Sequence, residues 1–583
     1  MNANNSTLIF TATSGTVFDG GEGPDLSITD STDCTFICDA GSGSQVWKNR
    51  FQSSDATIFV QSGTLSLSYW NWEDITNFFV GGTFDNSSAN RNVTTDNLTI
   101  PTGGTLSAGS GTLTCAGDFT TSGGLLGASA ITLDGGSPAS KFVSCNATVL
   151  NGATTFTIEA WIRPDVNNLG FQTIVCARDG GNDGVALSML NQTIRLRIGD
   201  GGSDDLVTDN VITTAGKWYH VVGLRDSSNN TKIYVDGKLV KQGTSSKSIS
   251  ISQDLKIGVQ SYDNNNGFDG SIDEVRIFND ERTQTEIRTN MFSEITSVGS
   301  DLILYAKFNE GNGNPVDSGT NSRTFTATGD IWAGTGTFTC GTSTLDFTGN
   351  GEWAISNNTT NYYNVKVAAS GKTTTINSVG SSERRPRITN LLTHGGGTLT
   401  DINNADIVFH GTGTHTAGAD LSGLYITYWP SSTDTPGGTY QFLITQHNDL
   451  STTGDITCTG YFAISTGDGF DLKDQTLTTP RFINYASSTF NMDAGSLVFT
   501  STQGLTGDYT GRTFTAGPGA TIDGVAAKSG FFSENNYQIV GDISDLDVTN
   551  EELTVVGTVT NCTGDILQFT PGHDTTLSLE TDT

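Results

Sequence analysis

Positive charge and proline are both scarce in this chain of 583 residues. Lysine and arginine number 29 against 61 aspartates and glutamates, which gives a net charge of −32. A negative field of this size repels nucleic acid backbones and anionic lipid headgroups, so neither is an expected partner. Only 11 prolines accompany 71 glycines, and together they stay below the content of about 25–30% that is typical of disordered chains.

Long hydrophobic runs are absent as well. No apolar stretch approaches the ~18 residues that a membrane span needs, so we expect no membrane insertion. Residues 1–6 lack the basic and apolar regions of a secretory signal. The chain is therefore expected to act where it is made, to leave by lysis or a dedicated exporter, or to be a processed form.

Cysteine and histidine form no metal or redox pattern. The eight cysteines are widely scattered and include no Cys-x-x-Cys pair, so buried free thiols are expected. The six histidines show neither HExxH nor facial-triad spacing, which gives a transition-metal enzyme little support.

What the sequence has in abundance is short strands and turns. Its apolar clusters are rich in Val, Ile, Phe, Tyr and Thr and are bounded by Gly, Asn, Asp or Ser, which are strand and turn signals. The best helical candidate is one short segment within residues 280–291. The predicted fold class is therefore all-β.

A loose repeat occurs before about residue 125 and after about residue 336, but not between them. In each copy a glycine precedes a segment of alternating polar and apolar residues. Such alternation between turns is typical of a β-solenoid or a stack of hairpins, because each unit buries its apolar face only against its neighbours. The copies are Gly63–Leu67, Gly104–Ser107, Gly111–Cys115, Gly336–Cys340, Gly397–Thr400, Gly454–Cys458 and Gly495–Phe499.

The middle of the chain has longer strands and a different texture. Five phrases follow one another there: Phe156–Pro164, Lys217–Leu224, Thr231–Val240, Gly267–Phe278 and Leu302–Gly311. The third contains Asp236-Gly237, which predicts a tight hairpin turn. Taken in this order, the phrases resemble a laminin-G-like, concanavalin A-like jelly-roll domain over about residues 128–330.

This resemblance implies two packed antiparallel sheets, with six residues in or near the core: Trp161, Trp218, Tyr234, Val275, Ile277 and Phe308. Domains of this kind often bind glycans, sometimes with a structural calcium ion. Calcium needs several hard oxygen ligands gathered from turns. The preferred calcium ligands, at strand ends near the closing edge of the implied fold, are Asp273, Asn309, Glu310 and Asp317.

Enzymes of the same superfold carry a paired-carboxylate strand of the Glu-x-Asp-x-x-Glu kind. The corresponding phrase here, residues 272–276, lacks that spacing. No strand is found to present two carboxyl groups ~5 Å apart, as a retaining glycosidase needs. Binding is therefore favoured over hydrolysis in this domain, and no catalytic residue is assigned.

Two aromatic groups are candidate ligand-binding residues, because sugars stack their apolar faces on aromatic rings. They are Tyr69, Trp70 and Trp72 in the first repeat region and Tyr428 and Trp429 in the second. Core or edge-covering packing is the alternative interpretation of the same rings.

These observations predict three parts. Residues 1–127 form an N-terminal β-repeat region, residues 128–335 a laminin-G-like β-sandwich, and residues 336–583 a C-terminal β-repeat region of one or two subdomains. The flanks are expected to be solenoids or sandwiches. Their Thr/Gly/Ser style resembles that of bacteriophage virion proteins and bacterial adhesins.

The favoured function is a non-enzymatic surface or structural protein with a glycan-recognition or adhesion module. We expect it on a phage virion, as a tail, fibre or capsid-surface component. Its partners would be cell-surface glycans or other virion and surface proteins, and trimerisation is left open.

Two other functions are kept as alternatives. One is a polysaccharide depolymerase with a carboxylate groove after residue 336, where the candidate residues are Asp401, Asp406, Asp468 and Asp471. The other is a bacterial adhesin located extracellularly on the cell surface.

Overall fold

The computed structural model divides into two compact units. The first comprises Met1–Gly341 with Ala354–Ser356 and Val379–Ser381, and the second comprises Thr342–Trp353, Asn357–Ser378 and Ser382–Thr583. The structure describes residues 7–11, 14–18, 26–27, 34–48, 51–121, 123–127, 129–180, 183–332, 336–355, 360–378, 385–402, 406–417, 419–430, 435–446, 450–485, 487–491, 495–505, 513–515, 520–524, 538–540, 543–547, 554–556, 558–563 and 576–577.

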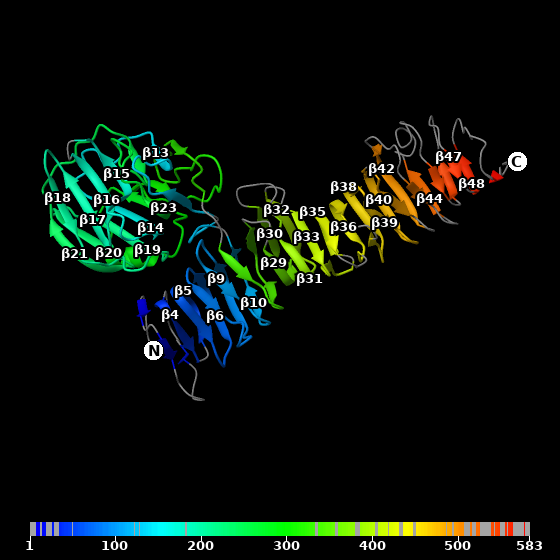
Figure 1. Ribbon diagram of the computed structural model, residues 1–583, viewed down its shortest axis with the longest axis horizontal. Coiled ribbons are helices and arrows are strands. Elements are labelled where there is room, and N and C mark those ends of the chain that lie inside the picture. Colours follow the sequence, from blue (N-terminus) through cyan, green and yellow to red (C-terminus); the bar gives the residue numbers. More distant parts are fainter. Residues whose placement is uncertain are drawn as a thin grey trace. The chain divides into compact units, whose positions relative to one another are not determined.

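The N-terminal part of the first unit is a stack of parallel strands (Figure 1). These are β1 (Thr7–Phe10), β2 (Ser14–Phe18), β3 (Leu26–Ser27), β4 (Cys34–Trp47), β5 (Phe51–Leu67), β6 (Trp72–Val80), β7 (Thr83–Asp85), β8 (Val93–Thr99), β9 (Thr105–Ser107), β10 (Thr112–Cys115) and β11 (Phe119–Thr120). β4 pairs with β5, β5 with β6 and β6 with β8, all in parallel. The predicted solenoid-like repeat is thereby confirmed for this region.

The sandwich is set between two coils of this stack. Strand β26 (Thr337–Thr339) follows the sandwich in the sequence, yet it pairs in parallel with β9, placing Thr337 opposite Thr105. The chain therefore leaves the stack after β11 and returns to it at β26. The expected boundary residues 128 and 335 lie outside the described residues.

The sandwich consists of two antiparallel sheets. Its strands are β12 (Ile131–Asp134), β13 (Phe142–Cys145), β14 (Phe156–Pro164), β15 (Phe171–Arg178), β16 (Gly184–Leu190), β17 (Thr193–Gly199), β18 (Ser203–Val207), β19 (Tyr219–Arg225), β20 (Asn230–Val235), β21 (Lys238–Thr244), β22 (Leu255–Ile257), β23 (Asp269–Phe278), β24 (Leu302–Ala306) and β25 (Phe325–Thr328). Sheet 1 has the order β12-β23-β14-β19-β20-β21, with β24 beside β23, and sheet 2 has the order β18-β17-β16-β15-β22-β13-β25.

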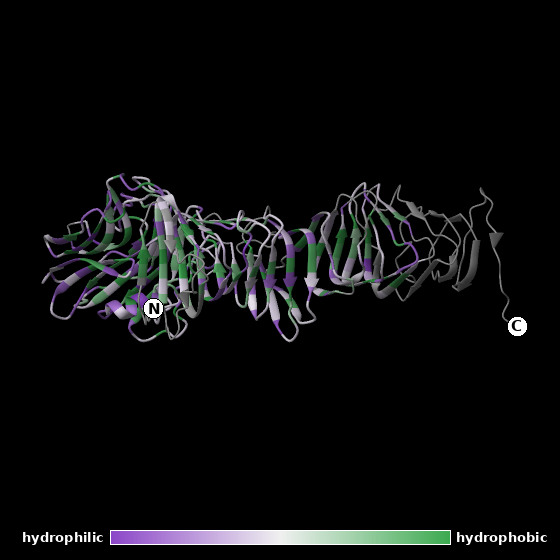
Figure 2. Cartoon of the chain, turned by 90° about the horizontal axis from the view of Figure 1, so that it is seen from below, coloured by the Kyte–Doolittle hydropathy of each residue, from purple (hydrophilic) through white to green (hydrophobic). Residues whose placement is uncertain are grey.

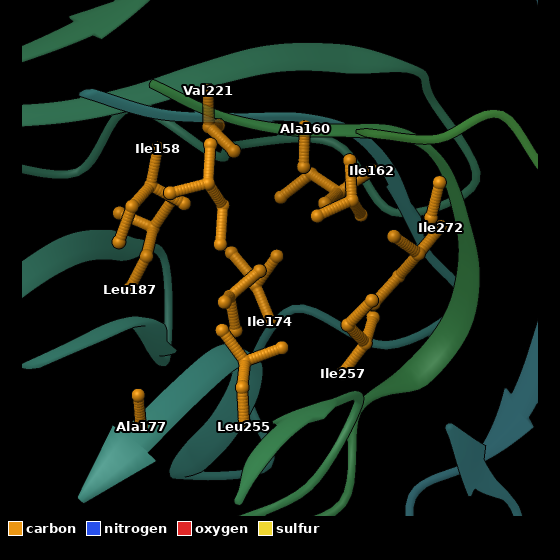
Figure 3. Packing of buried hydrophobic residues seen from close by; sticks show 14 of the residues in the cluster. Ile158, Ala160, Ile162, Ile174, Ala177, Leu187, Val221, Leu255, Ile257 and Ile272 are labelled. Atoms are coloured by element: carbon orange, nitrogen blue, oxygen red, sulfur yellow. The ribbon is translucent and has the colours of Figure 1, made fainter. Parts of the chain in front are cut away.

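The core of the sandwich lies between these sheets (Figure 3). Ile158 and Ile272 of sheet 1 and Leu187 and Ile257 of sheet 2 point toward one another and are fully buried. This arrangement follows from alternation along each strand, which sends every second side chain inward. The predicted jelly-roll-type sandwich is confirmed.

Two local predictions are also confirmed. Asp236 and Gly237 adopt φ angles of 49° and 68° between β20 and β21, the left-handed conformation that a tight hairpin turn requires. The short helix is α1 (Gln284–Asn290), and it begins with a capping box in which the side chains of Thr283 and Glu286 satisfy each other's backbone N–H groups.

The six expected core residues are all buried, but in three different places. Val275, Ile277 and Phe308 belong to the core between the sheets, whereas Tyr234 lies beneath α1. Trp161 belongs instead to a cluster that covers the outer face of sheet 1. This cluster, called the docking cluster below, comprises Ile37, Phe59, Phe79, Leu125, Leu126, Ala130, Trp161, Trp218, Met291 and Phe292.

The second unit is a second stack of parallel strands. They are β27 (Thr344–Phe347), β28 (Gly351–Ile355), β29 (Asn361–Val367), β30 (Thr373–Ser378), β31 (Arg387–His394), β32 (Thr398–Ile402), β33 (Asp406–Gly411), β34 (Thr414–His415), β35 (Ala419–Pro430), β36 (Gly438–Thr445), β37 (Leu450–Ser451), β38 (Ile456–Ile464), β39 (Gly469–Asp471), β40 (Thr476–Asn484), β41 (Thr489–Asn491), β42 (Ser496–Leu505), β43 (Thr513–Thr515), β44 (Ala520–Gly524), β45 (Gln538–Val540), β46 (Ile543–Asp547), β47 (Thr554–Val556), β48 (Thr558–Thr563) and β49 (Thr576–Leu577). One sheet runs in parallel from β33 through β35, β36, β38 and β40 to β42, and another from β37 through β39 to β41.

Hydrophobic and polar residues alternate along the described strands (Figure 2). Buried rings such as Phe462 and Phe482 stack on each other from coil to coil, 5.5 Å between centroids. Polar side chains also interact from coil to coil: the Asn390 amide donates to the Asn364 side chain at 2.7 Å. Both features are typical of a solenoid, in which each coil buries its face against the next.

The remaining expectations concern thiols and membranes. Six of the seven cysteines in the described part of the chain are buried and all seven are free, whereas Cys340 is half-buried. The side chain of Cys562 lies outside the described residues. In the described residues, no helix has the length and hydrophobicity required to cross a membrane.

Candidate functional site

A cavity of about 370 Å³ lies at one edge of the sandwich. It is bordered by the end of β23, the end of α1 and the segment that leads into β24. Its lining includes Phe278, Arg282, Asn290, Glu294, Ser297 and Asp301. The volume falls in the range of about 300–1,000 Å³ that small-molecule sites occupy.

One side of the cavity is built around Arg282. Its guanidinium nitrogen Nη1 lies 3.3 Å from Asp301 Oδ2 and 3.3 Å from Glu286 Oε1. The guanidinium also lies over the Phe278 ring, 4.6 Å from its centroid. Burial raises the pKa of Glu286, but hydrogen bonds from Thr283 and the charge of Arg282 lower it to a net value below normal. Arg282 is thus a fixed cation between two carboxylates.

The other side carries Glu294. Its Oε2 is 2.7 Å from the Lys307 ammonium group, and its Oε1 accepts from the Asn309 amide. The cavity therefore offers both donors and acceptors of hydrogen bonds, which is what a ligand rich in hydroxyl groups requires.

The segment that follows α1 is held from below by Arg276. This guanidinium donates to the carbonyl oxygens of Asn290 and Ser293, at 2.8 and 2.7 Å. It is itself paired with Glu274 at 2.5 Å, and the hydroxyl of Tyr305 donates to the same carboxylate. Because Arg276, Glu274 and Tyr305 are buried, they fix the wall of the cavity.

Two further titratable groups lie buried on the same face of sheet 1. Glu159 Oε2 is 3.7 Å from His220 Nε2 and 3.9 Å from Arg276 Nη1. Burial raises the pKa of Glu159 to about 7, an effect larger than the opposing one of Arg276. Burial, together with Arg276, lowers the pKa of His220 to about 3. Neither group can reach a polymeric substrate, because each is about 1% exposed.

The first calcium candidate, Asp273, is fully buried and has other partners. Its Oδ2 accepts from the backbone N–H groups of Leu125 and Leu126 at 2.7 and 3.2 Å, and its Oδ1 accepts from that of Glu274 at 3.0 Å. The carboxylate thereby ties the segment that enters the sandwich to β23.

The other three calcium candidates also have protein partners. Asp317 accepts from the backbone N–H groups of Tyr305 at 2.9 Å and Gly319 at 2.8 Å, Glu310 accepts from a backbone N–H, and Asn309 donates to a carboxylate. Among the described residues, no group of three or more His, Cys, Asp or Glu side chains could hold a metal ion. Calcium binding by the protein, with these four residues as its candidate ligands, stays a prediction.

The five candidate aromatic residues divide into two classes. Tyr69, Trp70 and Trp429 are 63, 45 and 51% exposed, whereas Trp72 and Tyr428 are fully buried. The last two are therefore corrected to core residues, because alternation along their strands turns them into the coils. Trp72 packs against Trp47 at 5.2 Å and Tyr428 against Phe409 at 4.7 Å.

The carboxylates considered for a depolymerase groove do not all lie on one sheet. Asp406 lies in β33, is 7% exposed and pairs with Arg385 at 2.8 Å. Asp471 lies in β39, which belongs to the sheet of β37, and its carboxylate accepts from the Lys473 N–H. Asp401 is in β32 and Asp468 precedes β39.

The residues that line the cavity were missed by the sequence analysis. Arg282 and Asp301 are separated by the helix and a loop, and no motif links them. One signal was available. Thr283 and Glu286 have the spacing of a capping box, which predicts the start of a helix at this point of the chain.

Comparison with known proteins supports the fold of this region. Residues 134–288 match the model of a family described as the concanavalin A-like lectin/glucanases superfamily, so the resemblance predicted for the central region is confirmed. No curated protein matches the chain.

The solved structures that are similar to the chain include the following three. A protein of Bacteroides ovatus described as carbohydrate binding is 21% identical over 37% of this chain and 62% of its own, with a TM-score of 0.30. The chain thus spans less than two thirds of that structure. A pentraxin of Limulus polyphemus is 15% identical over 35% of this chain and 94% of its own, with a TM-score of 0.27. The sialidase CBM40 domain of Ruminococcus gnavus, bound to α2,3-sialyllactose, is 16% identical over 27% of this chain and 95% of its own, with a TM-score of 0.23.

Proposed function

We propose that this protein is a non-enzymatic glycan-recognition protein and that its sandwich binds a sugar in the cavity beside α1. The observation that carries the proposal is the cavity itself: about 370 Å³, lined by a cation, carboxylates and an amide, in a sandwich matched to a superfamily that includes lectins. Convergent polar groups on a rigid scaffold are the usual form of a small-molecule site.

The burial of the acidic groups favours binding over hydrolysis. Glycoside hydrolysis needs two carboxyl groups that flank the scissile bond. Sheet 1 carries three carboxyl groups that could be considered for this role, but each is about 1% exposed or less: Glu159, Asp273 and Glu274. A polysaccharide chain has no access to them.

The proposal is tested on a glycan array with the full chain and two variants. We expect wild type to bind a defined set of sugars and Asp301→Ala to lose affinity about tenfold, since the change removes an acceptor from the cavity and releases Arg282, a loss of about 1.4 kcal/mol. Asp209→Ala removes an exposed carboxylate elsewhere on the sandwich and is expected to bind like wild type. A repeat with a chelator measures the predicted calcium dependence.

Two results would contradict the proposal: an array on which wild type binds no sugar, or equal losses in the two variants. Circular dichroism of each variant controls for unfolding. If Asp301→Ala unfolds, Asn290→Ala, which truncates another lining side chain at the end of α1, takes its place.

We further propose that this recognition module sits on the surface of a phage particle, in contact with other virion proteins. Its support is the architecture: the sandwich is set into a solenoid-like stack, a scaffold suited to holding a module away from a surface. Mass spectrometry and antibody-gold labelling of purified particles test the location. A bacterial cell-surface adhesin is the alternative, and labelling of cells instead of particles would favour it.

A further inference from the structure

The outward face of the second stack carries a row of side chains that no function assigned so far uses. The row comprises Trp429, Gln446, Ser465 and Tyr485, one from each of four successive coils. Trp429 is 51% and Tyr485 47% exposed, and Gln446 and Ser465 are half-buried. The exposed rings at the two ends of the row offer apolar faces on which sugar rings can stack.

Backbone hydrogen bonds keep these four residues in register. The N–H of Gln446 donates to the carbonyl of Tyr428 at 2.9 Å, that of Ser465 to Thr445 at 3.0 Å, and that of Tyr485 to Ile464 at 3.0 Å. The three acceptors, Tyr428, Thr445 and Ile464, each come immediately before a row residue in the sequence: Trp429, Gln446 and Ser465. The parallel ladder therefore extends through the row, and three strand spacings of ~4.8 Å place Trp429 and Tyr485 about 14 Å apart along the stack.

A second row, two residues earlier in each strand, forms the floor beside the first. Thr427 pairs with Ile444, Ile444 with Ala463 and Ala463 with Ile483. Apart from the half-buried Ile444, these side chains are at most 8% exposed. They are smaller than the rings on either side of them.

A third row forms the far wall. The Tyr425 ring stacks on Phe442 with centroids 4.1 Å apart, and the Tyr461 ring lies tilted by 49° against Phe442 at 4.4 Å. All three are half-buried, because each ring is partly covered by its neighbour in the next coil. The open ring faces of the surface are those of the first row.

The charge of this surface selects among ligands. Its first two rows contain no carboxylate and no cationic side chain. In the third row Asp406, opposite Tyr425, is paired with Arg385, and Arg481 continues that row in the fourth coil, beside Tyr461. The chain as a whole carries a net charge of −32. An anionic polymer would be repelled by that field, whereas an uncharged polyhydroxylated chain loses nothing.

We propose that this face binds a neutral glycan chain that lies along the stack, across the strands. The rings of Trp429 and Tyr485 stack against sugar rings at the two ends, while Gln446 and Ser465 form hydrogen bonds with hydroxyl groups between them. The site is separate from the sandwich cavity and does not depend on it.

The test uses the full chain and a series of uncharged linear oligosaccharides of increasing length, with binding measured by isothermal titration calorimetry. Affinity is expected to rise with length until the sugar spans the ~14 Å between the two rings, and then to level off. Trp429→Ala and Tyr485→Ala are each expected to weaken binding about threefold to tenfold. Phe171→Ala, which removes an exposed aromatic ring from the sandwich, is the control.

Four outcomes would overturn the proposal. They are the absence of binding to every uncharged oligosaccharide, unchanged affinity in Trp429→Ala, an equal loss in Phe171→Ala, and conversion of an oligomer into a monomer by Trp429→Ala. Sedimentation velocity measures the last, which would assign the face to a second copy of the chain. Failure here is distinguishable from failure of the sandwich site, because Trp429→Ala and Tyr485→Ala change only this face and Asp301→Ala changes only the cavity.

Discussion

At the scale of single residues, the buried groups on the outer face of sheet 1 couple stability to pH. Glu159 has an ordinary pKa of 4.5 that burial raises to about 7. His220 has an ordinary pKa of 6.5, which burial lowers to about 3. Each therefore favours its neutral form in the folded protein, and the two groups change stability in opposite directions over overlapping pH windows.

The signs follow from proton binding. Between about pH 4.5 and 7 the folded protein keeps a proton on Glu159 that the unfolded chain releases, so the free energy of unfolding falls as the pH rises through this window. Below pH 6.5 the unfolded chain binds a proton on His220 that the folded protein takes up only near pH 3. Stability is therefore lost as the pH falls through that window.

We predict that Glu159→Gln stabilises the protein above pH 7 by up to about 3 kcal/mol relative to its effect near pH 4.5, because it removes a charge that is costly to bury. Urea denaturation of wild type and variant across this range measures the difference. His220→Gln should act with the opposite sign, improving stability only on the acid side. Stability differences that stay constant with pH in both variants would show that neither group titrates as described.

At the scale of elements, the glycine that opens each repeat has a steric cause. A methyl group at Gly104 would lie 1.8 Å from the carbonyl oxygen of Val80, and one at Gly111 would lie 2.1 Å from that of Arg91. At Gly336 the corresponding distance, to the Ile100 carbonyl, would be 2.0 Å. Successive coils can approach this closely only where no side chain intervenes.

We predict that Gly111→Ala lowers the free energy of unfolding by about 1–3 kcal/mol, since the contacted atom is backbone and the coil must shift to relieve the clash. Gly202→Ala is the control, because a methyl group there would lie 3.7 Å from its nearest neighbour, the Lys247 ammonium nitrogen. Chemical denaturation compares the two. Equal stability of the two variants would mean that the close approach does not set the repeat.

The same elements show how far the sequence could lead. Period-two alternation predicted strands, Asp236-Gly237 predicted its hairpin and the glycine repeat predicted stacking, because each of these is a local property. Alternation predicts which residues share a side of the strand with Trp72 or with Trp429. It does not predict which side of the strand faces the interior of the coils. The cavity escaped prediction since Arg282 and Asp301 meet only through the loop that Arg276 holds.

At the scale of the whole molecule, the docking cluster makes the sandwich part of the first stack. Phe59 of β5 packs against Trp161 at 5.8 Å and Phe292 at 5.4 Å. Around this apolar contact, Gln61 donates to the Trp218 carbonyl at 2.9 Å and the Lys217 ammonium group lies 2.6 Å from Asp39. Burial raises the pKa of Asp39, but the charge and hydrogen bond of Lys217, together with hydrogen bonds from Ser62 and Gly41, lower it to a net value below normal.

This packing predicts that the sandwich and the N-terminal stack unfold together. Phe59→Ala, a change in the stack, should destabilise the sandwich as well, by the 3–5 kcal/mol or so that a buried phenylalanine contributes, and calorimetry should show one transition shifted to lower temperature. Phe171→Ala makes the same chemical change at a sandwich ring that is 39% exposed and should shift it little. Separate transitions, with that of the sandwich unmoved by Phe59→Ala, would instead describe a sandwich merely tethered to the stack. If the sandwich is fixed to the N-terminal stack in this way, the orientation of its cavity relative to the stack is constant. A constant orientation suits a recognition module better than attachment through a flexible linker.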